Sequence, residues 1–172
     1  HVGNYPGVTV EKKEGLRKYK DYEIRFVDLP GTYSLTAHSM EEIVARDFII
    51  EEQPDVVIDI IDASNFERNL YLATQLFELN VPLILVLNMA DMAKKQGLTF
   101  DTEKLCRFYN AEVVLTVGSK GKGIDELLDV IILKVQSKES TTVQNKNINK
   151  INYGSDIEKE HEKIEPLVNK EN

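Results

Sequence analysis

The strongest constraint on the fold is the alternation of short apolar runs with segments of helical periodicity. Residues 55–62 (DVVIDIID) and 82–88 (PLILVLN) are apolar throughout, as expected of strands that are buried on both faces. Residues 65–79, between them, repeat apolar side chains at helical spacing. Strands that alternate with helices indicate an α/β fold with a mainly parallel sheet.

The rest of the chain predicts further elements and two regions. A hairpin is expected from strands over 10–19 and 22–29, joined at Lys20-Asp21, after a loop over 1–9. Further expected elements are a strand over 112–117 and helices over 40–52, 101–109 (capped by Asp101 or Thr99) and 124–137. Residues 138–152 are expected to be a linker, and residues 153–172 to begin a second, helical domain with a helix over 153–168.

Composition excludes several classes of function. The 172 residues carry a net charge of −8, which argues against a basic face for nucleic acid, so no nucleic-acid partner is expected. A single cysteine, Cys106, excludes an intramolecular disulfide. The longest apolar run is far shorter than the roughly 20 residues of a membrane-spanning helix. Because the chain begins with His1 and not with Met, we interpret it as a piece of a longer or processed protein.

The segment DLPG, residues 28–31, ends a strand-like run. A carboxylate at the end of a strand can hold Mg²⁺, usually through water. A glycine three residues later lets its backbone N–H approach a phosphate with no Cβ in the way. Asp28 is therefore a candidate for binding a metal ion, and Gly31 is a candidate for binding a terminal phosphate. The alternative is an ordinary turn, in which Asp, Pro and Gly are also common.

The segment NMAD, residues 88–91, follows the apolar run PLILVL. The Asp91 carboxylate can accept hydrogen bonds from guanine N1–H and from the exocyclic amine, a donor pair that adenine lacks. Asn88 can brace neighbouring loops, and Met89 is long enough to cover the face of a purine. The alternative is that Asn88 and Asp91 only end a strand.

Two weaker candidates complete the series. Thr9, in GVTVE, can place its hydroxyl on Mg²⁺ and its N–H on a γ-phosphate, from a loop that becomes ordered when triphosphate binds. Gly118, Ser119 and Lys120 can offer backbone donors to the guanine carbonyl, or can simply form a turn into the next helix. Thr9, DxxG, NxxD and SKGKG stand in the order of the motifs of GTP-binding proteins.

Four strings of the sequence resemble the cytosolic G domain of FeoB, the bacterial ferrous-iron transporter family. They are VGNYPGVTVEKKEG, DLPGTYSLTAHSMEEIVARDFI, DASNFERNLYLATQLFELNVP and LNMADMAKKQG, and the resemblance runs from about residue 1 to residue 137. It implies a Ras-like (TRAFAC) P-loop GTPase sheet with flanking helices. It also implies GTP or GDP and Mg²⁺ as cofactors, with K⁺ as a further candidate.

The resemblance assigns roles to the motif residues. It makes Thr9 the switch threonine, Asp28 and Gly31 the second switch, and Asn88 and Asp91 the readers of guanine. It implies GTP hydrolysis coupled to Fe²⁺ uptake through the protein's own membrane domain, at the cytoplasmic face of the inner membrane. Formation of an oligomer stays open.

The sequence departs from the family pattern at two places. The phosphate-binding motif GxxxxGK[ST] does not occur in the 172 residues, and in the family it lies just upstream of HVGNYPGV, with the first strand and first helix. In a Ras-like sheet that strand lies between the strands expected at 22–29 and 55–62, so we expect a gap with unpaired backbone groups. Gly118-Ser119 stands where Ser-Ala is usual. Thr32 stands where Ras-type proteins carry a water-orienting Gln, and this agrees with the family, which resembles the group without that Gln.

Three interpretations therefore stand at this point. The first is part of a FeoB-type GTPase, whose isolated chain we expect to bind GTP weakly and to be inactive. The second is another Ras-like G protein that acts in ribosome or tRNA biogenesis. The third is an interaction module without catalysis, because the phosphate-binding motif is absent.

Overall fold

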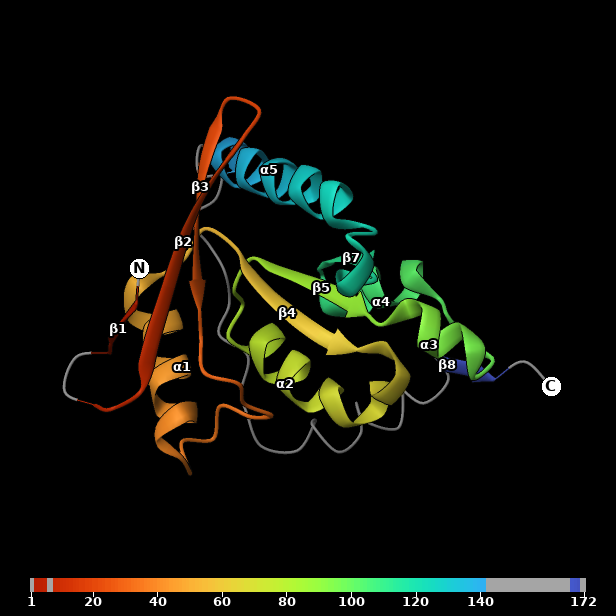
Figure 1. Ribbon diagram of the computed structural model, residues 1–172, viewed down its shortest axis with the longest axis horizontal. Helices are drawn as coiled ribbons and strands as arrows, with labels where there is room; N and C mark the ends of the chain where they lie inside the picture. Colours follow the sequence, from red (N-terminus) through yellow and green to blue (C-terminus); the bar gives the residue numbers. More distant parts are fainter. Residues whose placement is uncertain (1, 6–7, 142–167, 171–172) are drawn as a thin grey trace.

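In the computed structural model, which describes residues 2–5, 8–141 and 168–170, the strands form two separate three-stranded sheets and one two-stranded sheet. The first sheet is antiparallel in the order β1-β2-β3, and the second is parallel in the order β4-β5-β7 (Figure 1). The strand bounds are β1 Val2–Asn4, β2 Glu11–Tyr19, β3 Tyr22–Asp28, β4 Val57–Asp62, β5 Leu83–Asn88 and β7 Glu112–Leu115.

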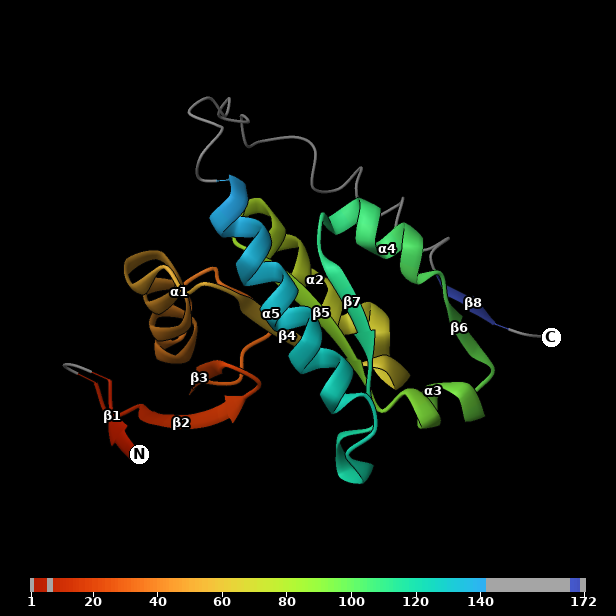
Figure 2. The same ribbon diagram turned by 90° about the horizontal axis from the view of Figure 1, so that it is seen from above.

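The parallel sheet is covered by helices on both faces. Helix α2, Phe66–Glu78, lies on one face and α5, Ile124–Thr141, on the other (Figures 1 and 2). Alternate side chains of β5 point to opposite faces of the sheet. Leu85 packs in the cluster that contains residues of α2, and Ile84 packs in the cluster that contains residues of α5. Both side chains are fully buried, so the expected strand over 82–88 is confirmed as one buried on both faces.

The antiparallel sheet is attached through helix α1, Met40–Glu52. Val44 and Phe48 of α1 pack with Tyr5 beside β1, and Ala45 and Ile49 of the same helix enter the core of the parallel sheet. The helix therefore packs against both sheets. Its bounds are those expected from the sequence.

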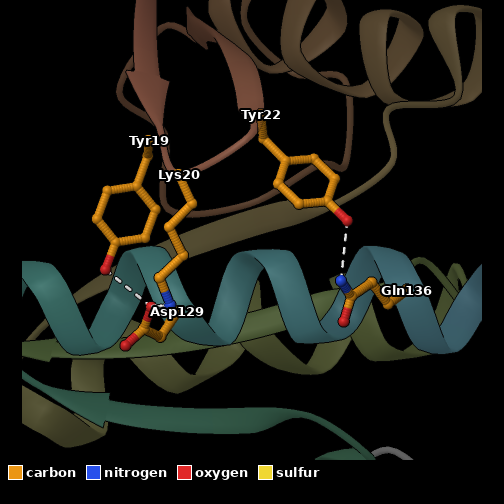
Figure 3. Close-up of polar contacts among 5 residues, drawn as sticks. All are labelled: Tyr19, Lys20, Tyr22, Asp129 and Gln136. Carbon is orange, nitrogen blue, oxygen red and sulfur yellow. Dashed lines mark hydrogen bonds and ion pairs between the residues drawn. The ribbon is translucent and has the colours of Figure 1, made fainter.

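The tip of the β2–β3 hairpin docks on α5 (Figure 3). Tyr19 Oη donates to Asp129 Oδ1 at 2.8 Å, and Lys20 Nζ pairs with the same oxygen at 2.5 Å. Gln136 Nε2 donates to Tyr22 Oη at 2.8 Å. Asp129 and Gln136 lie two turns apart on one face of the helix. The expected Lys20-Asp21 turn, with Lys20 at a left-handed φ of 53°, thus presents its flanking tyrosines to α5.

A cleft of about 830 Å³ separates β3 from β4. The two strands belong to different sheets, so their facing edges do not pair with each other, which is the gap expected from the sequence. The cleft is lined by both strands and by side chains of α1 and α5. Ile60 of β4 lines it and is 65% exposed. The expectation that residues 55–62 are buried on both faces is therefore wrong: among the described strands β4 is the edge strand of its sheet, and Ile60 opens into the cleft beside it.

The same cleft has one ionisable group buried in its wall. Asp59, in β4, is 7% exposed, and its Oδ2 has no hydrogen-bond partner among the described residues. Loss of solvation by burial raises the pKa of Asp59 to about 7. Burial favours the protonated form of this carboxyl group, so Asp59 opposes folding when it is ionised.

Several remaining elements differ from expectation. Residues 1–9, expected as a loop, contain β1, and neither α3 (Ala90–Lys95) nor β6 (Leu98–Phe100) was expected. Helix α5 continues to Thr141, so the expected linker does not begin at residue 138. Residues 142–167, which hold most of the linker and of the helix expected over 153–168, lie outside the described residues. Val168, expected to end that helix, instead begins strand β8 (Val168–Lys170), which pairs with β6.

Other local features follow the sequence. Helix α4, Thr102–Tyr109, is capped by Asp101, whose carboxylate accepts from the backbone N of Lys104 at 3.0 Å. Short 3₁₀ turns lie at Ala63–Asn65 (η1) and Gly118–Lys120 (η2). Among the helices of the described residues, none is long and apolar enough to cross a membrane.

We predict that Asp59→Asn removes a pH dependence from the stability of the chain. Because the pKa of Asp59 rises from 3.8 to about 7 on folding, the wild type should lose stability between about pH 4 and pH 7. The loss expected from this group is about 4 kcal/mol, complete above pH 7. Urea unfolding across that range measures it, with exposed Asp21→Asn as the control. Parallel pH profiles for wild type and Asp59→Asn would contradict the prediction.

Candidate functional site

The side chain of Asn88 ties together two chain segments at the carboxyl edge of the parallel sheet. Asn88 ends β5, and its Oδ1 accepts from Thr116 Oγ1 at 3.1 Å and from the backbone N of Gly118 at 2.9 Å. Thr116 is buried and also donates its backbone N to Leu87 O at 2.9 Å. Asn88 therefore holds the loop after β7 against the end of β5, which is the bracing role expected for it.

Asp91 lies in the first turn of α3, next to this loop. Met89 precedes the helix at a left-handed φ of 59°, and the backbone N of Ala90 donates to Thr116 O at 3.1 Å. Asp91 Oδ2 forms an ion pair with Lys120 Nζ at 2.5 Å. The hydrogen bond from Lys120 is the main cause that lowers the pKa of Asp91. The structure thus brings Asn88, Asp91, Gly118 and Lys120 into one group, which we call the base group.

The loop of the base group is closed by a glycine that cannot be replaced without strain. Val117 and Lys122 exchange backbone hydrogen bonds at 3.0 and 3.3 Å, so η2 and Gly121 form a tight turn between them. Gly123 follows at a φ of 81°, and a Cβ there would lie 2.3 Å from Leu115 O. The close approach of Gly123 to β7 therefore sets where the loop ends and α5 begins.

We predict that Gly123→Ala destabilises the chain. The left-handed backbone costs an L-residue about 1–2 kcal/mol, and the contact with Leu115 O forces a further shift. The free energy of unfolding should fall by about 2 kcal/mol or more in urea titration. Gly15→Ala is the control, because a Cβ at this strand glycine has nothing within 4 Å. Equal stability of the two variants would show that the turn is not strained.

The second group of predicted residues lies at the ends of β2 and β3. Asp28 ends β3 and is exposed, and Thr9 is exposed just before β2. Buried Tyr5 joins the two segments: its backbone N donates to Val10 O at 3.0 Å, and its Oη donates to Asp28 O at 3.2 Å. A single tyrosine in a Gly/Pro-rich loop carries no sequence signal for this bridging role.

The loop after Gly31 is organised by Glu42 of α1. Its carboxylate accepts from Ser34 Oγ at 2.7 Å, Thr36 Oγ1 at 3.2 Å and the backbone N of His38 at 2.8 Å. The first of these bonds is the main cause that lowers the pKa of Glu42. Ser39 Oγ caps the helix by accepting from the backbone N of Glu42 at 3.2 Å. The S-x-x-E spacing at 39–42 is a capping-box signal that sequence analysis passed over.

Helix α2 holds the same loop from the other side. The backbone N of Leu35 donates to Gln75 Oε1 at 2.6 Å, and Leu35 is buried in the core. The Arg68 guanidinium lies 4.6 Å from the centre of the Tyr33 ring, a cation–π contact. The segment that follows Asp28 is therefore anchored to two helices, although Tyr33 itself is 58% exposed.

The two groups occupy different parts of the fold. In the part of the chain that the structure describes, no hydrogen bond or ion pair joins Thr9, Asp28 or Gly31 to the base group. Asp28 and Gly31 instead line the cleft between β3 and β4. A Cβ added at Gly31 would meet nothing within 4 Å, so the chain itself does not require glycine there. Ser119 lies in η2 and is exposed.

A family model described as ferrous iron transport protein B matches residues 1–131 of this chain. The chain belongs to the FeoB family. A FeoA–FeoB fusion protein of Porphyromonas gingivalis is 45% identical over 172 residues, covering 98% of this chain and 20% of its own length. The chain thus spans about a fifth of the length of the curated FeoB relatives it matches.

Solved FeoB structures share the α/β fold. The cytosolic domain of Thermotoga maritima FeoB in a GDP form has a TM-score of 0.78 and 38% identity, covering 96% of this chain and 63% of that one. Its GMPPNP form has a TM-score of 0.77 and 39% identity at the same coverage. The FeoB G domain of Methanococcus jannaschii has a TM-score of 0.70 and 47% identity, covering 76% and 83%. This chain is therefore part of a FeoB N-terminal G domain.

Proposed function

We propose that this chain binds guanine nucleotides, and that the base group reads the guanine ring. The observation that carries the proposal is the pair of hydrogen bonds by which Asn88 Oδ1 holds the loop at Gly118 beside Asp91. This leaves Asp91, at the edge of the sheet, to accept the two guanine donors. Met89 is 40% exposed and can cover the ring, and the backbone of Gly118, Ser119 and Lys120 can donate to its carbonyl. Solved relatives in GDP and GMPPNP forms support this ligand class.

We assign the phosphates to the second group. The Thr9 hydroxyl and the Asp28 carboxylate are exposed oxygen donors of the type that Mg²⁺ prefers, and they would hold the ion directly or through water. Bound Mg²⁺ would offset the charge of the phosphates. Gly31 would bring its backbone N–H to the γ-phosphate, and its lack of a Cβ leaves room for that approach. Tyr5, which joins the Thr9 and Asp28 segments, would keep these donors together.

The cleft between β3 and β4 supports the Ras-like sheet order for the intact domain. Two facing strand edges without a shared ladder fit a further strand between them. We propose that the first strand of a Ras-like sheet, with its phosphate loop and helix, belongs there. The GxxxxGK[ST] motif does not occur in these 172 residues, which favours the second candidate function, nucleotide binding without hydrolysis, for this chain alone.

For the full-length protein we propose GTP hydrolysis coupled to Fe²⁺ uptake through its membrane domain. The G domain would lie at the cytoplasmic face of the membrane, with K⁺ as a further cofactor candidate. Residues 1–137 would belong to this domain, and residues 153–172 would begin the helical domain that follows it. These roles rest on membership of the FeoB family.

We predict that Asp91→Asn exchanges the base preference. Xanthine carries a carbonyl where guanine carries the exocyclic amine, so an asparagine amide complements xanthine and a carboxylate complements guanine. Affinity for guanosine diphosphate should fall roughly tenfold or more, and xanthosine diphosphate should become the better ligand. Calorimetric titration with both nucleotides measures the exchange.

The control for this exchange is Asp125→Asn, which changes an exposed carboxylate at the start of α5. It should keep the wild-type preference for guanine. If Asp91→Asn and the wild type prefer the same base, Asp91 does not read the ring and the proposed function is wrong.

A further inference from the structure

The ammonium group of Lys120 forms an ion pair with Asp91, the carboxylate that is proposed to read guanine. Lys120 Nζ lies 2.5 Å from Asp91 Oδ2. Asp91 is the more enclosed partner, with 29% of its side chain exposed against 65% for Lys120. The two residues come from different segments, α3 and η2, which Asn88 holds side by side. The pairing is therefore a product of the same loop packing that forms the base group.

We infer that Lys120 is an internal competitor of guanine: it pairs with Asp91 until a base binds, and it must release the carboxylate for the base to be read. The inference rests on the proposed function. A guanine ring needs the Asp91 oxygens for N1–H and the exocyclic amine, and one of these oxygens is held by Lys120. The lysine is long and exposed, so it can leave without moving the backbone of η2.

Competition by Lys120 predicts that the affinity for the base rises when Lys120 is removed, which a purely structural ion pair would not predict. Removing Lys120 should strengthen binding of the base, because Asp91 no longer exchanges one partner for another. Exposed ion pairs contribute little, so the gain should be roughly two- to fivefold. Salt screens exposed charges, and guanosine is uncharged. Raising the ionic strength should therefore strengthen guanosine binding to the wild type and leave the variant without Lys120 nearly unchanged.

The experiment is an NMR titration of the whole chain with guanosine at low and high salt. Lys120→Met keeps the length of the side chain and removes its charge. Lys122→Met is the matched control, because Lys122 is an exposed lysine of the same loop with no ion pair to Asp91. We expect tighter binding for Lys120→Met alone, and a rise of wild-type affinity with salt. Weaker binding by Lys120→Met, or equal gains in both variants, would overturn the inference.

A second measurement separates the inference from the proposed function. The carboxyl carbon of Asp91 reports its titration without any nucleotide, and Lys95 is the other cation that acts on it. Lys120→Met should raise the pKa of Asp91, and Lys122→Met should not. If this change is absent, the pair does not form and the inference fails while guanine binding stands. If the change occurs but guanosine binds no variant, the proposed function fails, and the inference with it.

Discussion

The parallel ladder β4-β5-β7 is the constraint on which the rest of the molecule depends. Its register pairs Asp62 with Asn88 and Leu87 with Leu115, so the three strands end at one edge. The polar residues that follow the strands must therefore meet there. Because β5 is buried on both faces, this edge cannot shift without exposing Ile84 or Leu85. The position of the base group is thus fixed by the packing of the core.

Within the residues that the structure describes, no backbone ladder joins the antiparallel sheet to the rest of the fold. It is held by α1, which packs on both sheets, and by the contact of the hairpin tip with Asp129 and Gln136 of α5 (Figure 3). These are side-chain contacts on the sides of a cleft, and the polar ones are partly exposed. The candidates Thr9 and Asp28 therefore lie at the antiparallel sheet, and the base group lies at the parallel sheet. A strand between β3 and β4 would unite them through backbone hydrogen bonds.

The elements that follow from periodicity, turn chemistry or capping chemistry could be predicted from the sequence. Helix α1 and the Lys20-Asp21 turn were predicted at their observed positions, and Asp101, which caps α4, was one of the two caps predicted for it. The gap beside β4 was predicted because the GxxxxGK[ST] motif and its strand do not occur in these 172 residues. The prediction failed for α3 and β6, which are short and depend on long-range packing. It also failed for Ile60, which is exposed because it lies on the edge strand β4 beside the cleft.

The residues of the candidate site were easier to predict than their partners. Motif order made Asn88 and Asp91 candidates, because the chemistry of a guanine ring calls for these residue types. Partners that act through space, such as Tyr5, Arg68 and Gln75, leave no local pattern in a single sequence. Lys120 belongs to both classes. Only the backbone of Lys120 was a candidate from the sequence, whereas the ion pair of its side chain with Asp91 needed the fold.

The central claim is that these 172 residues hold a complete base group without a complete phosphate site. Calorimetric titration of the chain with guanosine and with GDP, both with Mg²⁺, tests it most directly. We predict guanine-specific binding in which GDP is at most about tenfold tighter than guanosine, because few charge-assisted phosphate contacts are available. GDP that bound about a thousandfold tighter than guanosine would contradict the claim, since the phosphates would then have a full site within this chain.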